Sequence, residues 1–382
     1  MKNMKEKIEA SIMLASYFET VGFKNGVWEF NYKMPVSSIN VYTSMMSTML
    51  HHYMILGGNM IDITNFNSSD DTIMIISTAE AVIAGGGYDN YKKYYVDSYD
   101  LLIDEKRASG ITTIDSLEKI KKNIHIKSDS SMGGNGAAMR TGPIGLMWYD
   151  DYEKIIEESI IASKITHNYY IGILGGMVTA LFTSFAMKNI KPWLWVETLL
   201  DIYKKELIHK YYENISELDE FMSYWKRYQE TRISKLKYKN SLDFFIYTED
   251  RANYLLGFNP SSKIKALVVK GQRLDKLTSE WGRIGTTGLD ACIYAYDCLL
   301  MCMNSDGTKT LDFDNITYNF NTFMTLVSIH PGDSDTTAAI GGTWFGALLG
   351  YDIFDVSNLK KLEFYEELKK VSNKIIKSRN LS

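Results

Sequence analysis

Two aspartates, Asp333 and Asp335, stand directly before an uncharged stretch rich in glycine and alanine, TTAAIGGTWFGALL. This composition predicts a buried helix over Thr336–Leu349, because a helix that is apolar all round has no face to present to water. Two carboxylates at the start of a buried helix lose hydration and repel each other. The motif GDSDTT contains no lysine or arginine to offset them. A bound divalent cation is therefore the simplest expectation.

A second acidic motif, Ser69-Asp70-Asp71-Thr72, lies where a polar loop leads into a helix predicted over Thr72–Ala84. Taken alone it is typical of a helix N-cap, where Ser and Asp side chains and negative charge are favoured. Together the two motifs offer carboxylates and hydroxyls without clustered His or Cys, which favours Mg²⁺ or Mn²⁺ over zinc. With water and substrate oxygens added, this set suits a two-metal site.

Two glycine-rich stretches are candidates for anion-binding loops. The first, GGNGAAMR (Gly133–Arg140), leads into a helix predicted from Ala137, and the second, GRIGTTG (Gly282–Gly288), precedes another predicted helix. Backbone N–H groups at a helix start can hold a phosphate or pyrophosphate. Each stretch is equally typical of a tight turn, so both interpretations stay open at this point.

The rest of the chain favours one all-α domain over residues 1–382, because predicted helices far outnumber strands and no repeat or low-complexity linker interrupts them. Residues 88–106 are rich in tyrosine and predicted to be helical, and 235–280 also allows short strands such as Ala266–Val269. The apolar stretch Tyr169–Met187 just reaches membrane-spanning length. We expect a buried central helix there, and no membrane association.

Charge and cysteine usage limit the partners and the compartment. The net charge of −4 lacks the basic excess of a dedicated nucleic-acid binder, so we expect no nucleic-acid partner. The three cysteines, Cys292, Cys298 and Cys302, form no disulfide framework and fit a reducing compartment. The N-terminus lacks the apolar core of a signal peptide. We therefore expect a cytoplasmic protein, acting as a monomer.

Several segments, in this order, resemble the ADP-ribosylglycohydrolase family over nearly the whole chain. They are NGVWEF (Asn25–Phe30), SDDTIM with the following TAEA, GNGAAMR, THN (Thr166–Asn168), GLDA with the following YAYD, and HPGDSDTTAAIGG. The NGVWEF and GDSD elements are more similar to the ADP-ribosylarginine hydrolase branch than to the branch acting on ADP-ribosylserine and poly(ADP-ribose). SDDT combined with GDSDTTAAIGG is a specific signature.

The resemblance implies an all-α orthogonal bundle with two Mg²⁺ ions in a central cleft, acting on an ADP-ribosylated protein or small molecule. Glu29 matches the family's glutamate near the metals and the scissile ribose. By the same resemblance, the metal ligands fall on Ser69, Asp70, Asp71, Asp333, Asp335 and Thr336. The phosphates would lie against Gly134, Asn135 and Gly136, and further ligand contacts fall on His167, Gly285, Thr286 and Thr287.

The reaction implied by this branch is Mg²⁺-dependent hydrolysis of the N-glycosidic bond between ADP-ribose and an arginine side chain. A guanidinium group keeps its proton up to a pKa of roughly 12 or more, so it can depart as neutral guanidine with little help from a general acid. What remains is to stabilise an oxocarbenium-like state and deliver water. Glu29 or one of the aspartates Asp70 and Asp71 is the expected proton acceptor.

Two departures from the family pattern motivate an alternative, an ADP-ribose-binding protein with weak or no catalysis. Phe18-Glu19-Thr20-Val21-Gly22 stands where the family has Gly-Asp-Ala-Leu-Gly, and Leu289 replaces the histidine of Gly-His-Asp-Ala. Glu19 is a candidate substitute for the family's aspartate. A hydrolase of O-linked (serine or O-acetyl) ADP-ribose and a two-metal phosphohydrolase are further alternatives.

Overall fold

The computed structural model describes residues 3–30, 39–235, 284–303, 316–352 and 354–381. Over these residues the chain forms α-helices and short 3₁₀ helices, with isolated β-bridges and no strand. The all-α fold expected from the sequence is confirmed. The strand considered at Ala266–Val269 lies outside the described residues.

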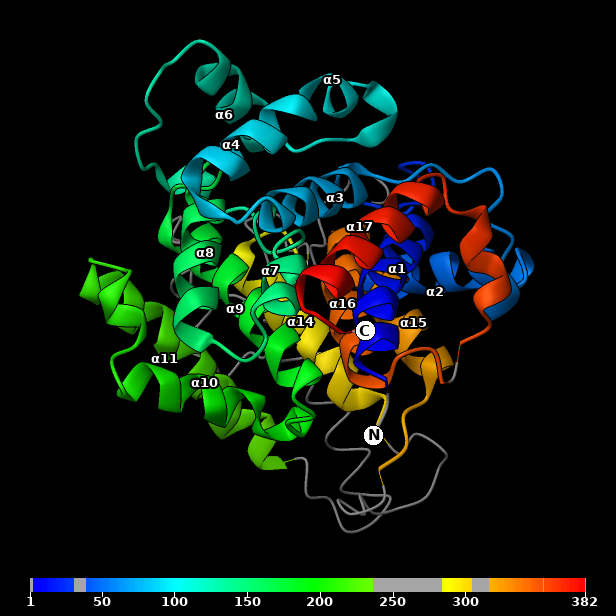
Figure 1. Ribbon diagram of the computed structural model, residues 1–382. Helices are drawn as coiled ribbons and strands as arrows, with labels where there is room; N and C mark the ends of the chain where they lie inside the picture. The colour runs from blue at the N-terminus through cyan, green and yellow to red at the C-terminus, as the bar shows by residue number, and fades with distance from the viewer. Residues whose placement is uncertain (1–2, 31–38, 236–283, 304–315, 353, 382) are drawn as a thin grey trace.

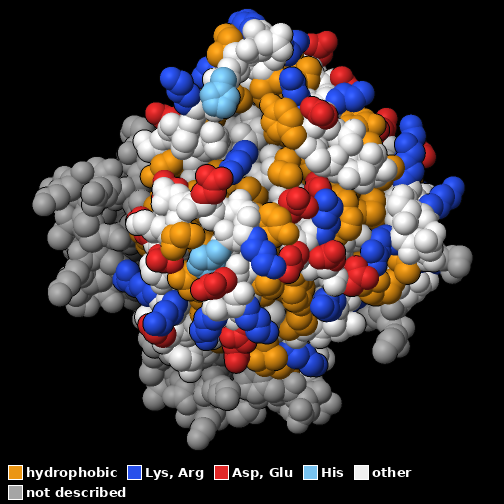
Figure 2. All heavy atoms as spheres, turned by 60° about the vertical axis from the view of Figure 1, so that its left-hand side comes forward, with side chains coloured by type: hydrophobic (Ala, Val, Ile, Leu, Met, Phe, Trp, Pro, Cys, Tyr) orange, Lys and Arg blue, Asp and Glu red, His pale blue; other side chains and the backbone are white. Residues whose placement is uncertain are grey.

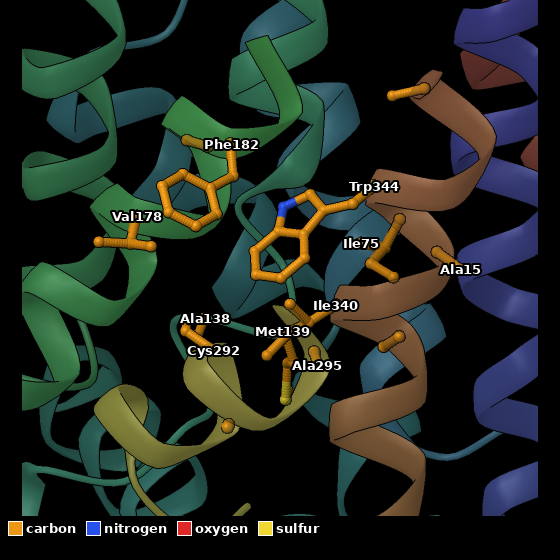
Figure 3. Packing of buried hydrophobic residues seen from close by; sticks show 14 of the residues in the cluster. Ala15, Ile75, Ala138, Met139, Val178, Phe182, Cys292, Ala295, Ile340 and Trp344 are labelled. Carbon is orange, nitrogen blue, oxygen red and sulfur yellow. The ribbon is translucent and has the colours of Figure 1, made fainter. Parts of the chain in front are cut away.

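The buried centre of the described fold is built from α1 (Met4–Phe23), α9 (Tyr170–Met187), α14 (Gly288–Met301) and α16 (Ser334–Leu349). Helix α16 lies along α1 and also contacts α9 and α14 (Figure 1). Trp344 projects from α16 toward Phe182 of α9, and the two ring centroids are 5.3 Å apart (Figure 3). Its Nε1 donates to the Thr179 carbonyl oxygen at 3.1 Å, so the buried indole keeps a hydrogen-bond partner.

Glycines explain how closely α16 packs on α1. A Cβ atom at Gly342 would lie 2.4 Å from the Leu14 carbonyl oxygen, and one at Gly346 would lie 2.4 Å from the Ala10 backbone. Both distances are too short for any side chain, so the two backbones can approach this closely only with glycine at these positions. The glycine-rich composition that predicts burial of this helix is thus also a requirement of helix packing.

Further helices surround this centre, and α4, α5 and α6 lie together at the top of Figure 1 while α10 and α11 lie at its lower left. On the face shown in Figure 2, positive and negative side chains are interspersed. The surrounding helices are α2 (Ile39–Ile55), α3 (Asp70–Ile83), α4 (Gly87–Asp97), α5 (Tyr99–Leu102), α6 (Ile111–Lys121), α7 (Gly142–Met147), α8 (Tyr152–Lys164), α10 (Trp195–Lys204), α11 (Ile215–Thr231), α15 (Phe320–Ser328) and α17 (Tyr365–Ser378).

Helix α9 is the described helix that is long and apolar enough to cross a membrane by length and composition. All of its residues are buried inside the fold. The expectation of a central helix wrapped by others is therefore confirmed for Tyr170–Met187.

Two helix predictions are wrong in detail. Ala137 begins no helix: residues 136–140 form turns, and α7 starts at Gly142 with Pro143 in its first turn. A helix running from Ala137 through Pro143 would lose a backbone hydrogen bond and clash with the proline ring, whereas the first turn tolerates proline. The predicted helix 88–106 is divided into α4, α5 and the 3₁₀ helix η2 (Glu105–Arg107). At the first division the Ser98 hydroxyl bonds back to the Tyr95 carbonyl oxygen at 2.9 Å, a local bond that competes with a continuous helix.

Candidate metal and substrate site

The starts of α3 and α16 meet, and the loop carrying Glu29 joins them. Oxygen atoms of Glu29, Asp333 and Asp335 all lie within 4.8 Å of one another. Across the two helix starts, the Thr336 hydroxyl donates to Asp71 Oδ1 at 3.4 Å. The structure therefore brings Glu29 together with the residues of both acidic motifs, 265 positions apart at this contact.

The Glu29 loop is tied to both acidic segments. The Asn25 side-chain amide donates to the Asn65 carbonyl oxygen at 3.1 Å, and its oxygen accepts from Asn67 N at 2.6 Å. On the other side of Glu29, Phe30 N donates to the Gly332 carbonyl oxygen at 2.9 Å. Gly26, at φ 75°, lies in the left-handed region that glycine adopts readily, within the turn that this loop makes. Glu29 itself is half-buried.

The first acidic motif is held from α1 by Glu19. The Glu19 carboxylate accepts hydrogen bonds from Ser69 N and Ser69 Oγ, both at 3.2 Å, and from the Thr72 hydroxyl. Ser69 Oγ in turn accepts from Asp71 N at 3.3 Å as the N-cap of α3. Because the hydroxyl proton points at Glu19, the second lone pair of Ser69 Oγ remains available to a cation. Burial raises the pKa of Glu19 to about 8.

The second acidic motif is held by His330 and Ile284. Gly332 N donates to His330 Nδ1 at 3.2 Å, so Nδ1 is an acceptor and Nε2 is left to donate to the Thr337 hydroxyl at 2.7 Å. Asp333 N donates to the Ile284 carbonyl oxygen at 2.8 Å. A Cβ atom at Gly332 would lie 2.2 Å from that same oxygen, so this close approach requires glycine.

Burial and mutual repulsion disfavour the ionised form of the whole cluster. Burial first, and then the charge of Asp335, raise the pKa of Asp70 to about 7 and that of Asp71 well above its usual range. The same two causes raise the pKa of Asp333 and of Glu29. Arg140 lowers the pKa of Asp70, but only as a minor opposing influence.

Two buried carboxylate oxygens in the cluster, Asp71 Oδ2 and Asp333 Oδ1, have no hydrogen-bond partner among the described residues. Buried polar atoms without partners are rare in native proteins, and a bound ion is one explanation for them. The donors in reach are carboxylate and hydroxyl oxygens, the ligands that hard divalent cations prefer. The residues present therefore fit Mg²⁺ or Mn²⁺.

His167 lies under the first glycine loop. A Cβ atom at Gly136 would lie 2.5 Å from His167 Cε1, and one at Gly134 would lie 3.5 Å from Nε2. Thr166 Oγ1 accepts from Arg140 Nη2 at 2.6 Å and lies 2.8 Å from His167 Nδ1, to which its own proton can be donated. Nε2 then carries the ring proton. Burial lowers the pKa of His167 to about 3, and the nearby Arg140 charge adds to this effect.

The second glycine loop lies beside the first. Gly134 and Thr287 form an isolated β-bridge, and Gly288 N donates to the Gly133 carbonyl oxygen at 3.2 Å. Asn135 Nδ2 donates both to Gly285 O at 2.5 Å and to Asp333 Oδ2 at 2.8 Å. One amide thus connects both glycine loops to the acidic cluster. Gly282 and Arg283 lie outside the described residues.

Asp290 organises this second loop, although no role is expected for it from the motifs of the sequence. Its carboxylate accepts from Gly285 N at 2.9 Å and from Thr287 N at 2.6 Å, and it closes a capping box with Thr287 at the start of α14. Burial raises the pKa of Asp290 to about 7. The Thr287-x-x-Asp290 spacing is the sequence signal that could have identified it. The hydroxyl of Thr286 is buried without a partner among the described residues.

The two departures from the family pattern have structural explanations. Phe18 packs against Phe323 and Phe345, with ring centroids 5.7 and 6.1 Å away, and a Cβ atom at Gly342 would lie 2.8 Å from its ring. The large side chain is thus accommodated opposite a glycine in an aromatic cluster. Leu289 is buried, so an apolar side chain suits the position where the family has histidine.

Comparisons with a family model and with related sequences point to the same family, and a comparison with solved structures points to the same fold. Residues 40–382 match the family model described as ADP-ribosylglycohydrolase. ADP-ribosylhydrolase ARH1 of Dictyostelium discoideum is 30% identical to this chain over 398 residues, covering 94% of this chain and 91% of the relative. The putative ADP-ribosyl glycohydrolase L444 of Acanthamoeba polyphaga mimivirus is 30% identical, over 87% of this chain and 62% of its own length. A solved structure described as an ADP-ribosylglycohydrolase-related protein complex shares the fold, with a TM-score of 0.52 at 15% identity and 99% of both chains covered.

Proposed function

The chain belongs to the ADP-ribosylglycohydrolase family, whose activity is hydrolysis of ADP-ribosyl compounds, and we propose that it releases ADP-ribose from a modified arginine side chain with Mg²⁺. The observation that carries the proposal is the meeting of both acidic motifs and Glu29 around buried, unpartnered carboxylate oxygens. The arginine linkage is supported by the NGVWEF and GDSD elements.

We assign two Mg²⁺ ions to oxygen atoms of both helix starts. When bound there, they would polarise ribose hydroxyls and lower the pKa of a coordinated water. One unpartnered oxygen belongs to Asp71 in the first turn of α3 and the other to Asp333 at the N-cap of α16, which supports a site shared by both helix starts. The full set of assigned ligands is Ser69, Asp70, Asp71, Asp333, Asp335 and Thr336.

Glu29 is the favoured proton acceptor among the carboxylates of this cluster. It is half-buried, whereas Asp71 is 1% exposed, so Glu29 is better placed to face a water that enters with the substrate. In the step assigned to it, the water oxygen bonds to the anomeric carbon of ribose as the bond to the guanidinium nitrogen breaks. The electron pair leaves with neutral guanidine, and the proton of the water passes to Glu29.

The glycine loops and His167 are assigned to the ADP-ribose phosphates. His167 offers a neutral ring whose Nε2 proton faces Gly134 and Gly136, which suits a donor to phosphate oxygen. Because Asn135 bonds to both Gly285 and Asp333, a ligand on these loops would reach the acidic cluster. This continuity favours a hydrolase over a module that only binds ADP-ribose.

The test is release of ADP-ribose from ADP-ribosylarginine, measured with Mg²⁺, with Mn²⁺ and with EDTA. We expect release with either cation and its loss with EDTA. Asp333→Asn should remove most of kcat, while Asn substitution of the exposed Asp100 should leave kcat unchanged. Equal turnover with EDTA would refute the metal assignment.

Parallel substrates separate the alternatives. Faster turnover of ADP-ribosylserine or O-acetyl-ADP-ribose would identify an O-linked hydrolase, and release of AMP or phosphate would identify a phosphohydrolase. Tight ADP-ribose binding by calorimetry without turnover of any of these substrates would establish a binding protein instead.

A further inference from the structure

A two-pronged ion pair between Arg107 and Glu363 lies outside the motifs considered so far. Arg107 Nη1 lies 2.6 Å from Glu363 Oε2, and Nη2 lies 2.8 Å from Oε1. Arg107 ends η2, and Glu363 lies between the 3₁₀ helix η8 (Val356–Lys361) and α17. The Arg107 side chain is only 4% exposed, and its guanidinium carbon lies 5.2 Å from the centre of the Phe364 ring. Bidentate geometry and the burial of the arginine distinguish this pair from ordinary surface ion pairs, while the Glu363 side chain is 29% exposed.

Both members of the pair bind the backbone of Ser68. Arg107 Nη1 donates to the Ser68 carbonyl oxygen at 2.8 Å, and Ser68 N donates to Glu363 Oε2 at 3.1 Å. These partners lie 39 and 295 positions away in the sequence. Ser68 directly precedes Ser69, the N-cap of α3, so its backbone sets where the first acidic motif begins.

The segment that follows Arg107 reaches the motif as well. Gly110 N donates to Asp70 Oδ2 at 3.4 Å, and Ser109 Oγ donates to the Leu102 carbonyl oxygen at 2.7 Å. Ala108 has a φ of 52°, so the chain turns sharply between Arg107 and Gly110. The connection between α5 and α6 therefore contacts both Ser68 and Asp70.

We propose that Arg107 and Glu363 form a clamp that positions the Ser69–Asp71 ligands for the divalent cation. This inference rests on the cation site of the proposed function. The carboxylate of Glu363 offsets the charge of Arg107, so the clamp fixes geometry without presenting an unpaired cation that would compete with the metal ion. Partners of metal ligands commonly act in this way, by orienting groups that they support from outside.

The clamp is a positioning device, and its test uses metal affinity rather than turnover as the main readout. Arg107→Gln and Glu363→Gln each remove the two-pronged pair. The matched control is Lys369→Gln, which breaks the 2.9 Å ion pair between Lys369 of α17 and Glu9 of α1. Mn²⁺ affinity is measured by electron paramagnetic resonance, and amide exchange of residues 68–72 is measured in the metal-free protein.

We expect the clamp variants to weaken Mn²⁺ binding by about tenfold, the lower end of the effect of losing such partners. Exchange at residues 68–72 should accelerate, and turnover should recover at saturating Mg²⁺. The control should show wild-type Mn²⁺ affinity even where its Tm falls. Arg107→Lys keeps the charge and one hydrogen bond, so its Mn²⁺ affinity should be intermediate. This variant provides the test if the glutamine variants do not fold.

Unchanged Mn²⁺ affinity in folded clamp variants would overturn the clamp and leave the proposed function standing. Weakened affinity in a protein that releases no ADP-ribose from arginine would support the clamp and refute the proposed function. A wild-type protein that binds neither Mn²⁺ nor Mg²⁺ would overturn both.

Discussion

Replacing Asp70 by asparagine should stabilise the metal-free protein at neutral pH while removing its response to Mg²⁺. Asp70 is 7% exposed, and burial together with the Asp335 charge raises its pKa from 3.8 to about 7. An acid whose pKa is higher in the folded state holds its proton longer there than in the unfolded chain. Stability is therefore greatest below the unfolded pKa, and it is lost as pH rises from about 4 to about 7.

The magnitude follows from the size of the shift. A rise from 3.8 to about 7 corresponds to at most about 4 kcal/mol of unfolding free energy lost by neutral pH, at roughly 1.4 kcal/mol per pH unit. Asparagine carries no charge, so it escapes this cost, and its side-chain oxygen can still accept the hydrogen bond from Gly110 N. We expect a gain of about 1–4 kcal/mol for Asp70→Asn in EDTA at neutral pH, and little gain near pH 4.

The assay is urea unfolding of wild type, Asp70→Asn and the surface control Asp100→Asn, each in EDTA and in millimolar Mg²⁺. A cation that binds only the folded state adds stability by mass action. Wild type and the control should gain stability with Mg²⁺, whereas Asp70→Asn should gain little. A variant less stable than wild type in EDTA at neutral pH would refute the reasoning, because it would mean that the Asp70 carboxylate contributes stability without a cation.

Three other predictions address the loops and the helix packing. Thr166→Val breaks the hydrogen-bonded connection from Arg140 to His167 and should raise the KM for substrate about tenfold, the range expected for unpairing buried polar groups. Mn²⁺ affinity should stay at the wild-type value, and Thr166→Ser should restore KM. The pKa of His167 falls from 6.5 to about 3 on folding, so its stabilising contribution is present above pH 6.5 and declines as pH falls. Between neutral pH and pH 5, wild type should therefore lose about 2 kcal/mol more unfolding free energy than His167→Asn, as measured by urea unfolding. Gly22→Ala places a Cβ atom 2.5 Å from the Ser334 carbonyl oxygen and should weaken Mn²⁺ binding. The control Gly346→Ala lies at the other end of the α1–α16 contact. It should cost about 1–3 kcal/mol of stability and leave the Mn²⁺ affinity of the folded protein unchanged.

The sequence predicts the helices that carry the acidic motifs because composition determines their burial. Asp333 and Asp335 precede a helix whose glycines are required for contact with α1, and both the burial and the glycines are visible in the sequence. The predicted helix start at Ala137 is wrong, and Pro143 indicates this in the sequence, because it lies too close downstream for a continuous helix. Asp290 likewise had a capping-box spacing that indicates its role.

Other parts of the site have no local signal. Arg107 and Glu363 stand among charged neighbours, in DEKRAS and KKLEFY, which are typical of a solvated surface. Their pairing is set by how the α5–α6 connection and the C-terminal segment dock on the same loop, and a single sequence does not specify that contact. Glu19 could be recognised only by its place in the family pattern, because its hydrogen bonds to Ser69 depend on α1 packing beside α3.

These supports bear on how the site would bind the proposed cation. Each acidic loop is fixed by a group from a distant segment: Glu19 and the Arg107–Glu363 clamp hold the first, and the Ile284 carbonyl oxygen holds the second. Backbone and side-chain hydrogen bonds therefore order the ligands before a cation arrives, although their charges repel. The conformational entropy of these loops is already lost when the protein folds, so a cation that binds there does not have to order them. Holding these carboxylates together costs electrostatic free energy. This cost appears as raised pKa values of Asp70 and Asp71 rather than as disorder of the ligands. Folding supplies the geometry, and the proposed cation would supply the positive charge that the carboxylates lack. Substitutions outside the cluster should therefore change metal affinity through geometry, and substitutions within it through charge.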